Sequence, residues 1–276
     1  MITTKKGNLR LKEVQRKVKS KLGLREINPR PHFLGVGTQK GGTTTLYQLL
    51  KKHPEIHLPE NKEIHFFTKY YDRGENWYRS QFKDAPAGKI RGEITPYYLF
   101  YAAAPQRIHR FRTDMKIIAL VRNPIERTLS QYFHSYRLKR ETLTLEKALA
   151  AEQERLNGIE EKILVHGGNN LSYQEHSYVS RSRYETQLER YFNFFGKENV
   201  LVLRSEDLFD GNRNAVIAIQ EHLELAPFPK DTVIPRANQG FSESDKVSQK
   251  IRERLKGEFQ ATFRWMKETL NIEWNT

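Results

Sequence analysis

Residues 37–44 read Gly-Thr-Gln-Lys-Gly-Gly-Thr-Thr, and this mixture of glycines, a lysine and hydroxyl side chains suits an anionic ligand. Glycines let backbone N–H groups converge on a phosphate, while a lysine adds a full positive charge and threonine hydroxyls add donors. A short apolar run precedes the segment and a helical pattern follows it, which is the context that a phosphate-binding loop requires. We call residues 37–44 the phosphate loop. Its candidate ligand contacts are Lys40, Gly41, Gly42, Thr43 and Thr44.

A second charged position follows another apolar run. Residues 115–121 are mainly apolar and lead directly to Arg122, where nucleotide triphosphatases commonly place a carboxylate for Mg²⁺. An arginine repels a metal ion and instead matches a phosphate with paired hydrogen bonds. In the phosphate loop, Thr43 stands where the P-loop lysine belongs, and Lys40 lies inside the loop. The pattern predicts phosphate binding without a metal, and we assign no metal ligand.

The elements that must position these residues alternate between strands and helices. Asn123 is a candidate N-cap and Pro124 suits the first position of a helix, where a missing N–H costs nothing. An apolar stripe over residues 247–270 predicts one long C-terminal helix packed by one face. This alternation predicts an α/β domain with a central parallel sheet flanked by helices. The predicted strands are 32–36, 115–121 and 200–203, and the predicted helices are 43–52, the segment after 123, 184–195 and 212–223.

Length and composition indicate a folded protein with one large domain. The chain has 276 residues, and we divide it into a basic arm, residues 1–30, and a domain, residues 31–276. The arm carries a net charge of +8 out of the total of +14, and its apolar residues recur at near-helical spacing. The chain has no cysteine, which excludes disulfides and thiolate chemistry and favours a reducing compartment. With no long apolar stretch and no signal-peptide pattern, we expect a cytoplasmic protein without a transmembrane segment.

Several separate segments resemble the sulfotransferases that use 3′-phosphoadenosine 5′-phosphosulfate (PAPS), particularly the heparan-sulfate-type sulfotransferase domain and its bacterial relatives. The phosphate loop is similar to the 5′-phosphosulfate motif of that family, and Leu120–Tyr132 is similar to its 3′-phosphate motif. Asn61–Phe67, Glu93–Tyr98 and Tyr184–Tyr191 also resemble family segments. The resemblance runs from Phe33 to Leu225 and contains both phosphate motifs in the family order.

The resemblance implies an enzyme of the EC 2.8.2 class that moves a sulfuryl group from PAPS to a hydroxyl or amine acceptor. The reaction would be an in-line, metal-independent displacement that releases adenosine 3′,5′-bisphosphate. Lys40 would contact the 5′-phosphosulfate and stabilise charge on the leaving group, and Gly41, Gly42, Thr43 and Thr44 would complete its cradle. Arg122 and Ser130 would hold the 3′-phosphate. Tyr184 is a weaker candidate for the same region, and packing in the core explains it equally well.

Glu63 is our candidate for the general base, because it occupies the carboxylate position of the similar family segment. It precedes the apolar pair Phe66 and Phe67, a setting that we expect to raise its pKa. His65 is the competing base. His134 is a third option, although its place within a helix favours a structural role.

The sequence departs from the heparan-type pattern in two places. Ile94 stands where a lysine that assists catalysis or acceptor binding is often found, and Arg236–Ser242 matches only loosely the loop that closes over the nucleotide. We expect the acceptor pocket to come from variable loops, Asp72–Ala87 and Leu138–Val179. We expect the acceptor to be a carbohydrate, a lipid or another small molecule, and the sequence does not distinguish O- from N-sulfation or indicate an oligomeric state.

Two other readings of the sequence make different predictions. A P-loop kinase or nucleotide hydrolase would share the strand, loop and helix but would need Mg²⁺ and a contact to a γ-phosphate. A nucleic-acid-binding protein would use the basic arm and a phosphate pocket without catalysis, but no nucleic-acid-binding module is recognisable. We therefore expect no specific nucleic-acid partner.

Overall fold

The architecture is taken from a computed structural model of the chain, which describes residues 18, 29–229, 231–235 and 243–275. Most of the basic arm and the segment Arg236–Ser242 therefore lie outside the described residues, and the division at residue 30 stays a prediction. The helices among the described residues include none that is long and apolar enough to cross a membrane.

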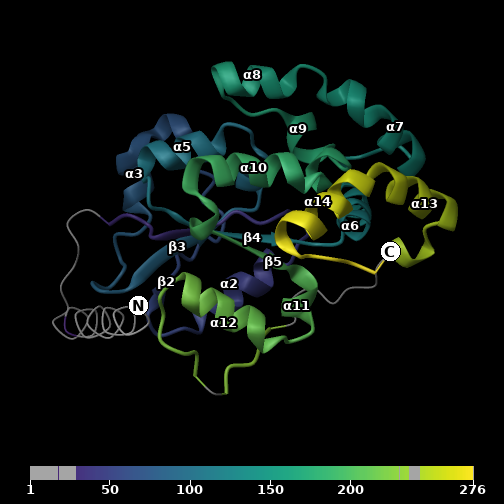
Figure 1. Cartoon of the computed structure of the whole chain (residues 1–276). Coiled ribbons are helices and arrows are strands. Elements are labelled where there is room, and N and C mark those ends of the chain that lie inside the picture. The colour runs from purple at the N-terminus through teal and green to yellow at the C-terminus, as the bar shows by residue number, and fades with distance from the viewer. Residues whose placement is uncertain (1–17, 19–28, 230, 236–242, 276) are drawn as a thin grey trace.

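A five-stranded, fully parallel sheet forms the centre of the molecule (Figure 1). Its order is β2-β3-β1-β4-β5, so the chain starts in the middle strand and builds outward on both sides. The register pairs Gly35 of β1 with Ile94 of β3 and with Ile118 of β4. This confirms the predicted α/β class with a central parallel sheet. The strands are β1 Phe33–Gly35, β2 Ile56–His57, β3 Ile90–Ile94, β4 Lys116–Val121 and β5 Val200–Arg204.

Helices cover both faces of this sheet (Figure 1). The α-helices are α2 Thr43–Lys51, α3 Gly74–Ser80, α4 Tyr97–Phe100, α5 Ala104–Phe111, α6 Pro124–Arg137, α7 Leu145–Leu156, α8 Ile159–His166, α9 Leu171–Glu175, α10 Tyr184–Phe195, α11 Ser205–Phe209, α12 Arg213–His222, α13 Gln249–Glu258 and α14 Gln260–Leu270. The 3-10 helices are η1 Tyr71–Arg73, η2 Ser180–Ser182, η3 Lys197–Asn199 and η4 Glu243–Lys246. Helices α2 and α12 lie on one face, and α5, α10 and α14 lie on the other.

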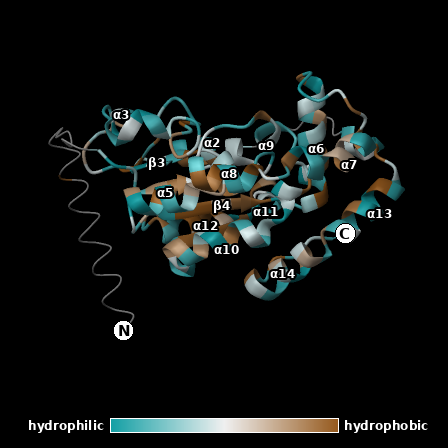
Figure 2. Ribbon diagram, turned by 90° about the horizontal axis from the view of Figure 1, so that it is seen from above, coloured by the Kyte–Doolittle hydropathy of each residue, from teal (hydrophilic) through white to brown (hydrophobic). Residues whose placement is uncertain are grey.

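Strand β4 shows why the sheet is apolar on both sides. Successive side chains of a strand point to opposite faces, so Ile118 and Leu120 join the core beneath α2 and α12, while Ile117 and Ala119 join the core beneath α5 and α10. A strand buried on both faces reads as a continuous apolar run, which made β4 recognisable in the sequence. Figure 2 shows this strand as a brown arrow between amphipathic helices.

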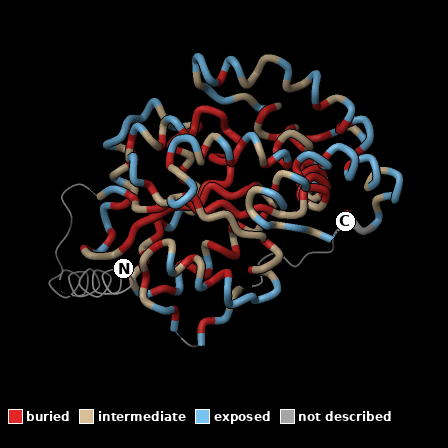
Figure 3. The backbone as a smooth tube through the Cα atoms, in the orientation of Figure 1, coloured by how far each residue is buried: buried red, intermediate tan, exposed pale blue. Residues whose placement is uncertain are grey.

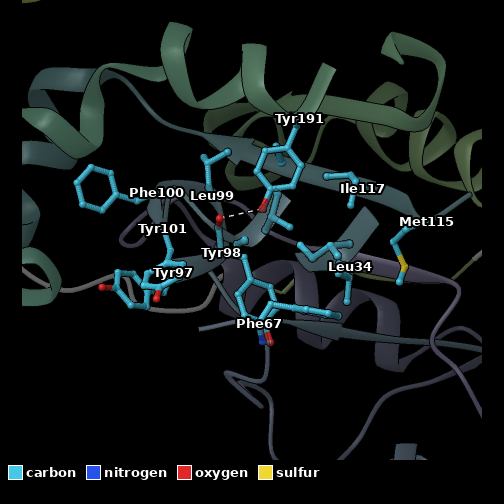
Figure 4. Packing of buried hydrophobic residues seen from close by; sticks show 14 of the residues in the cluster. Leu34, Phe67, Tyr97, Tyr98, Leu99, Phe100, Tyr101, Met115, Ile117 and Tyr191 are labelled. Carbon is cyan, nitrogen blue, oxygen red and sulfur yellow. Dashed lines mark hydrogen bonds between the residues drawn. The ribbon is translucent and has the colours of Figure 1, made fainter. Parts of the chain in front are cut away.

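The larger core is rich in aromatic side chains (Figure 4). Tyr191 of α10 donates its hydroxyl to the carbonyl oxygen of Tyr98 at 2.8 Å, so a buried polar group is satisfied inside this core. Phe67 packs edge-on against Tyr98, with their ring centroids 5.4 Å apart. The loop after β2 is thereby fixed to α4.

The predicted helix after residue 123 begins as expected. The side chain of Asn123 accepts hydrogen bonds from the backbone N–H groups of Ile125 and Glu126, and Pro124 is the first residue of α6. Helix α10 has the predicted bounds, and α12 begins after the N-cap Asn212. These parts of the sequence prediction are confirmed.

The single C-terminal helix was a wrong prediction. The stripe is divided between α13 and α14, which meet at Phe259, a residue with φ −102° and ψ 10°. Leu255 of α13 packs in a cluster with α6, whereas Met266 of α14 packs in the core beneath α10. The break lets one stripe serve two cores that lie in different directions.

The two segments predicted as loops contain helices. Asp72–Ala87 includes all of α3, and Leu138–Val179 contains α7, α8 and α9. Helix α8 is largely exposed and lies farthest from the sheet, whereas the sheet itself is buried (Figure 3). The polar composition of Leu138–Val179 therefore reflects helices with a solvent-exposed face, and not irregular structure.

Candidate active site

All five strands deliver site residues to the same edge of the sheet. The phosphate loop follows β1, Arg122 follows β4, and Ser205 follows β5. Thr95 follows β3, and the segment with Glu63 comes after β2. Carboxyl ends of parallel strands share one edge, and ligands of such sheets bind there. The topology therefore brings together residues that are distant in the sequence.

The phosphate loop turns tightly between β1 and α2. Lys40 has φ 67° and Gly42, the N-cap of α2, has φ 80°, so two residues lie in the left-handed region. The backbone N–H of Gly41 donates to the carbonyl of Thr38 at 2.9 Å, and a β-carbon on Gly41 would lie 2.5 Å from the Thr38 side chain. Only glycine fits there. The loop thus delivers Lys40 at the start of a helix, where free N–H groups favour an anion.

Hydrogen bonds join the two phosphate motifs. Nη1 of Arg122 donates to the carbonyl oxygen of Lys40 at 3.3 Å. The hydroxyl of Ser205 donates to the carbonyls of Gly41 at 2.6 Å and of Val121 at 3.0 Å. The structure thus brings Arg122 against the phosphate loop.

Tyr184 supports this arrangement from inside the core. Its side chain is fully buried, and its hydroxyl donates to the carbonyl of Arg122 at 2.7 Å. Burial raises the pKa of this phenol, so it stays a neutral donor. Of the two readings of Tyr184, the structure favours a core residue that holds the backbone of Arg122.

One face of α6 adds positive charge to the site. Burial, together with the charges of Arg137 and Arg122, lowers the pKa of Lys40. Burial and the charge of Lys40 in turn lower the pKa of His134, which lies one turn before Arg137. Ser130 lies on the same helix face, four residues before His134, and is partly exposed. Ser130, His134 and Arg137 therefore share the face that looks toward Lys40.

Glu63 and His65 form a pair on the other side of the site. Oε2 of Glu63 lies 3.3 Å from Nε2 of His65, and Oε1 accepts a hydrogen bond from Nζ of Lys62 at 2.9 Å. Burial opposes ionisation of Glu63, but His65 and Lys62 outweigh it and lower the pKa of the carboxyl to about 2. The expected upward shift was wrong, because Phe66 and Phe67 point into the core and leave the carboxylate among cations.

The Glu63–His65 segment is fixed by a buried carboxylate that the sequence analysis did not single out. Glu93 of β3 is fully buried, and its Oε2 accepts a hydrogen bond from the backbone N–H of Ile64 at 3.3 Å. Burial raises the pKa of Glu93, and three hydroxyl groups donate to its oxygens. These donors are Tyr78 at 2.9 Å, Tyr98 at 2.7 Å and Thr95 at 2.6 Å.

The side chain of Ile94 is fully buried in the core that contains α2 residues. It therefore supplies no substitute for the lysine of the family pattern. Lys62 was also missed, although it stands directly before Glu63 and adjacency was an available signal. Among the described residues, no group of three or more histidines, cysteines or carboxylates could hold a metal ion.

Comparisons with known proteins agree with this geometry. The model of the sulfotransferase domain family matches residues 30–256. The heparan sulfate glucosamine 3-O-sulfotransferase 6 of Homo sapiens is 43% identical over 102 residues, which are 37% of this chain and 30% of that protein. The membrane-associated sulfotransferase kil1 of Dictyostelium discoideum is 40% identical over 108 residues, 38% of this chain and 23% of that protein. The match thus spans less than a third of the length of these curated relatives.

A solved structure extends the likeness to nearly the whole chain. The sulfotransferase from Alicyclobacillus acidocaldarius superposes with a TM-score of 0.71 and 28% sequence identity. The alignment covers 89% of this chain and 98% of the other. Because the family model spans most of the chain and includes both phosphate motifs, this protein belongs to the sulfotransferase domain family.

Proposed function

We propose that this chain transfers a sulfuryl group from PAPS to a hydroxyl or amine acceptor and releases adenosine 3′,5′-bisphosphate. One observation carries the proposal. Arg122 is hydrogen-bonded to the backbone of Lys40, and Glu63 and His65 lie beside the same loop, linked to it through Lys62 and Thr43. The site thus combines two anion-binding elements with a proton acceptor.

The donor side would use the phosphate loop and α6. Lys40, Thr43, Thr44 and the N–H groups of Gly41 and Gly42 would bind the 5′-phosphosulfate, and Arg122 and Ser130 would bind the 3′-phosphate. Burial and the charges of Arg137 and Arg122 lower the pKa of Lys40, so an anionic ligand would relieve the repulsion among these cations. Lys40 would then stabilise the negative charge that develops on the departing 5′-phosphate.

The acceptor side would use Glu63 and His65 as one unit. The acceptor oxygen or nitrogen would attack sulfur, the bond between sulfur and the bridging phosphate oxygen would break, and the acceptor proton would pass to Glu63 or His65. The low pKa of Glu63 makes its carboxylate a weak base on its own. Its contact with His65 at 3.3 Å also lets it orient that imidazole as the base.

Several finer points belong to this proposal. A metal-independent reaction is supported by Arg122 at the position where a magnesium carboxylate would stand. A carbohydrate hydroxyl as acceptor is supported by the similarity to a glucosamine 3-O-sulfotransferase. A cytoplasmic location is supported by a sequence without cysteine.

Calorimetric titration of adenosine 3′,5′-bisphosphate in buffer with chelator and no Mg²⁺ tests the function. We expect tight binding to the wild type and a loss of roughly 10- to 100-fold in Arg122→Ala, because a charged hydrogen bond to phosphate is removed. Parallel titrations with ATP and Mg²⁺ test the kinase alternative. Absence of binding to the wild type, or preference for ATP with Mg²⁺, would overturn the sulfotransferase proposal.

A further inference from the structure

Arg181 is a buried cation next to the phosphate loop. Arg181 is only 2% exposed and lies in η2. In the sequence it stands 142 positions after Gln39. Nη1 donates to the side-chain oxygen of Gln39 in the phosphate loop. Nη2 donates to the carbonyls of Tyr173 at 3.0 Å and Gln174 at 2.8 Å, and Nε donates to Ser177 at 3.2 Å.

No carboxylate in the described part of the chain forms an ion pair with Arg181. Burying a charge is costly, and replacing a buried ionic group with an apolar one is often neutral or stabilising. The contacts of Arg181 are neutral oxygens and two aromatic rings. Of these contacts, the one with Gln39 of the phosphate loop points to a role in the site.

The same guanidinium also lies over two aromatic rings. Its carbon is 5.2 Å from the ring centroid of Tyr97 and 4.8 Å from that of Phe100, both on α4. Figure 4 shows Tyr97 and Phe100 together with Tyr98 and Leu99, the residues between them in α4. The Tyr97 ring in turn lies 6.3 Å from the ring of His65. Arg181 thus touches both the phosphate loop and the residue that packs beside His65.

These contacts belong to a closed chain of side chains that begins and ends on the phosphate loop. His65 lies 3.3 Å from Glu63, and Glu63 accepts a hydrogen bond from Lys62 at 2.9 Å. Lys62 in turn donates to the hydroxyl of Thr43, in the phosphate loop, at 3.1 Å. The members in order are Gln39, Arg181, Tyr97, His65, Glu63, Lys62 and Thr43. Because this chain of contacts is closed, it fixes the distance between the phosphate loop and the candidate bases Glu63 and His65 from two sides.

We propose that Arg181 is a positioning residue for sulfuryl transfer, which acts through Gln39 on the phosphate loop and through Tyr97 on His65. The proposal rests on the proposed function. It assigns Arg181 no contact with either substrate. A planar, delocalised guanidinium suits this task, because it can donate to several oxygens and stack on aromatic rings at once.

The experiment measures binding of adenosine 3′,5′-bisphosphate by calorimetry and fold stability by urea unfolding. We expect Arg181→Met to weaken binding by about tenfold, or about 1.4 kcal/mol. Gln39→Met, which leaves Arg181 unchanged, should weaken binding of the bisphosphate by a similar factor. The double variant should bind no more weakly than Arg181→Met, because both changes break one contact. Arg181→Lys should restore little, since an ammonium lacks the planar fork.

Arg91→Met is the matched control. Arg91 is also a buried arginine, and it lies near the start of β3, at the opposite end of the strand from the site. Its Nε donates to the carbonyl oxygen of Arg30 at 3.1 Å. Arg91→Met should change stability while leaving the affinity within about twofold. Equal weakening in Arg91→Met, or additive effects of Gln39→Met and Arg181→Met, would overturn the proposal.

Two further outcomes are separable. If the wild type does not bind the bisphosphate, the proposed function fails before the role of Arg181 is addressed. If the wild type binds and both Arg181→Met and Gln39→Met bind equally well, the function stands and the positioning role is wrong. Should Arg181→Met fail to fold, Gln39→Met alone decides, because its side chain is partly exposed and its removal leaves the core intact.

Discussion

Nζ of Lys62 lies 3.1 Å from Oγ1 of Thr43, and this contact joins the segment that carries Glu63 to the first turn of α2. The same ammonium donates to Glu63 at 2.9 Å. Lys62 is thus shared by the phosphate loop and the carboxylate of the candidate base. A ligand that contacts Thr43 is thereby coupled to the charge state of Glu63.

Replacing Lys62 with methionine tests this coupling. Because Lys62 is one of the groups that lower the pKa of Glu63, we expect Lys62→Met to raise that pKa, as measured by carbon NMR titration of the carboxyl group. With an acceptor found by screening, kcat should fall by roughly tenfold, less than the loss of 100-fold or more from removing a general base. Lys51→Met, on the exposed face of α2, is the control. An unchanged titration of Glu63 would refute the coupling.

The low pKa of Glu63 predicts a pH dependence of stability. A carboxyl whose pKa is lower in the folded state stabilises the fold above its unfolded pKa, near 4.5, and loses that contribution as pH falls toward 2. Since the side chain of Glu63 is 39% exposed, solvent screening limits the contribution to about 1 kcal/mol. Urea unfolding should therefore show Glu63→Gln less stable than wild type at pH 7, with the difference vanishing between pH 4.5 and 2.

Glu60→Gln is the matched control for this pH series, because Glu60 is exposed and lies in the same loop. Its stability should follow that of the wild type across the range. A difference between Glu63→Gln and wild type that keeps its pH 7 size at pH 2 would show that the carboxylate is not the source.

The two phosphate motifs of the candidate site were recognisable in the sequence because each has a local signature. Apolar runs marked β1 and β4, and glycines with Asn123 marked the turns after them. Strand β3 was missed because its interior reads Arg91-Gly92-Glu93, which breaks the apolar pattern, although all five of its residues are buried. Tertiary contacts override local pattern here, since Glu93 is satisfied by hydroxyl donors from other elements.

The cross-links of the site could not be predicted from local pattern. Arg181 and Gln39 are 142 residues apart, and Ser205 and Gly41 are 164 apart. Only the topology, which brings every strand end to one edge, makes these pairs neighbours. The predicted direction of the pKa shift of Glu63 was wrong for the same reason. The sequence showed its apolar neighbours, but not that they turn away into the core.

The buried carboxylate of Glu93 is expected to control the placement of the Glu63–His65 segment. Glu93→Gln keeps the shape but turns one oxygen into an NH₂ group, so the N–H of Ile64 and the hydroxyls of Tyr78 and Tyr98 can no longer all donate to it. We expect a loss of about 1–3 kcal/mol in the free energy of unfolding. Transfer should slow, while affinity for adenosine 3′,5′-bisphosphate changes little, because Glu93 does not contact the phosphate loop. Calorimetry and kinetics on the same variant separate these effects.

Tyr78→Phe serves as the comparison for Glu93→Gln. It removes one hydroxyl that donates to Glu93 at 2.9 Å and leaves the bond to Ile64 intact. Its cost should be about 1 kcal/mol, with little change in the transfer rate. Equal slowing in both variants would show that Glu93 acts on general stability and not on the position of Ile64.

Gly42 provides a test of the loop conformation. Gly42 has φ 80°, and a β-carbon there would lie 2.7 Å from the ring of Phe209. Gly158 is a matched position, because it is also a left-handed N-cap residue, with φ 69°, and a β-carbon there would meet no atom within 4 Å. Gly158→Ala should therefore cost only the backbone strain, about 1–2 kcal/mol.

Gly42→Ala should cost more than Gly158→Ala and should also weaken binding of adenosine 3′,5′-bisphosphate, because the clash with Phe209 displaces the start of α2. In a Phe209→Leu background, the additional cost should largely disappear, while the strain common to both glycines remains. Thermal unfolding and calorimetry on the four proteins measure these terms. If Gly42→Ala and Gly158→Ala destabilise equally and affinity is unchanged, α11 does not press on the phosphate loop as the distances require.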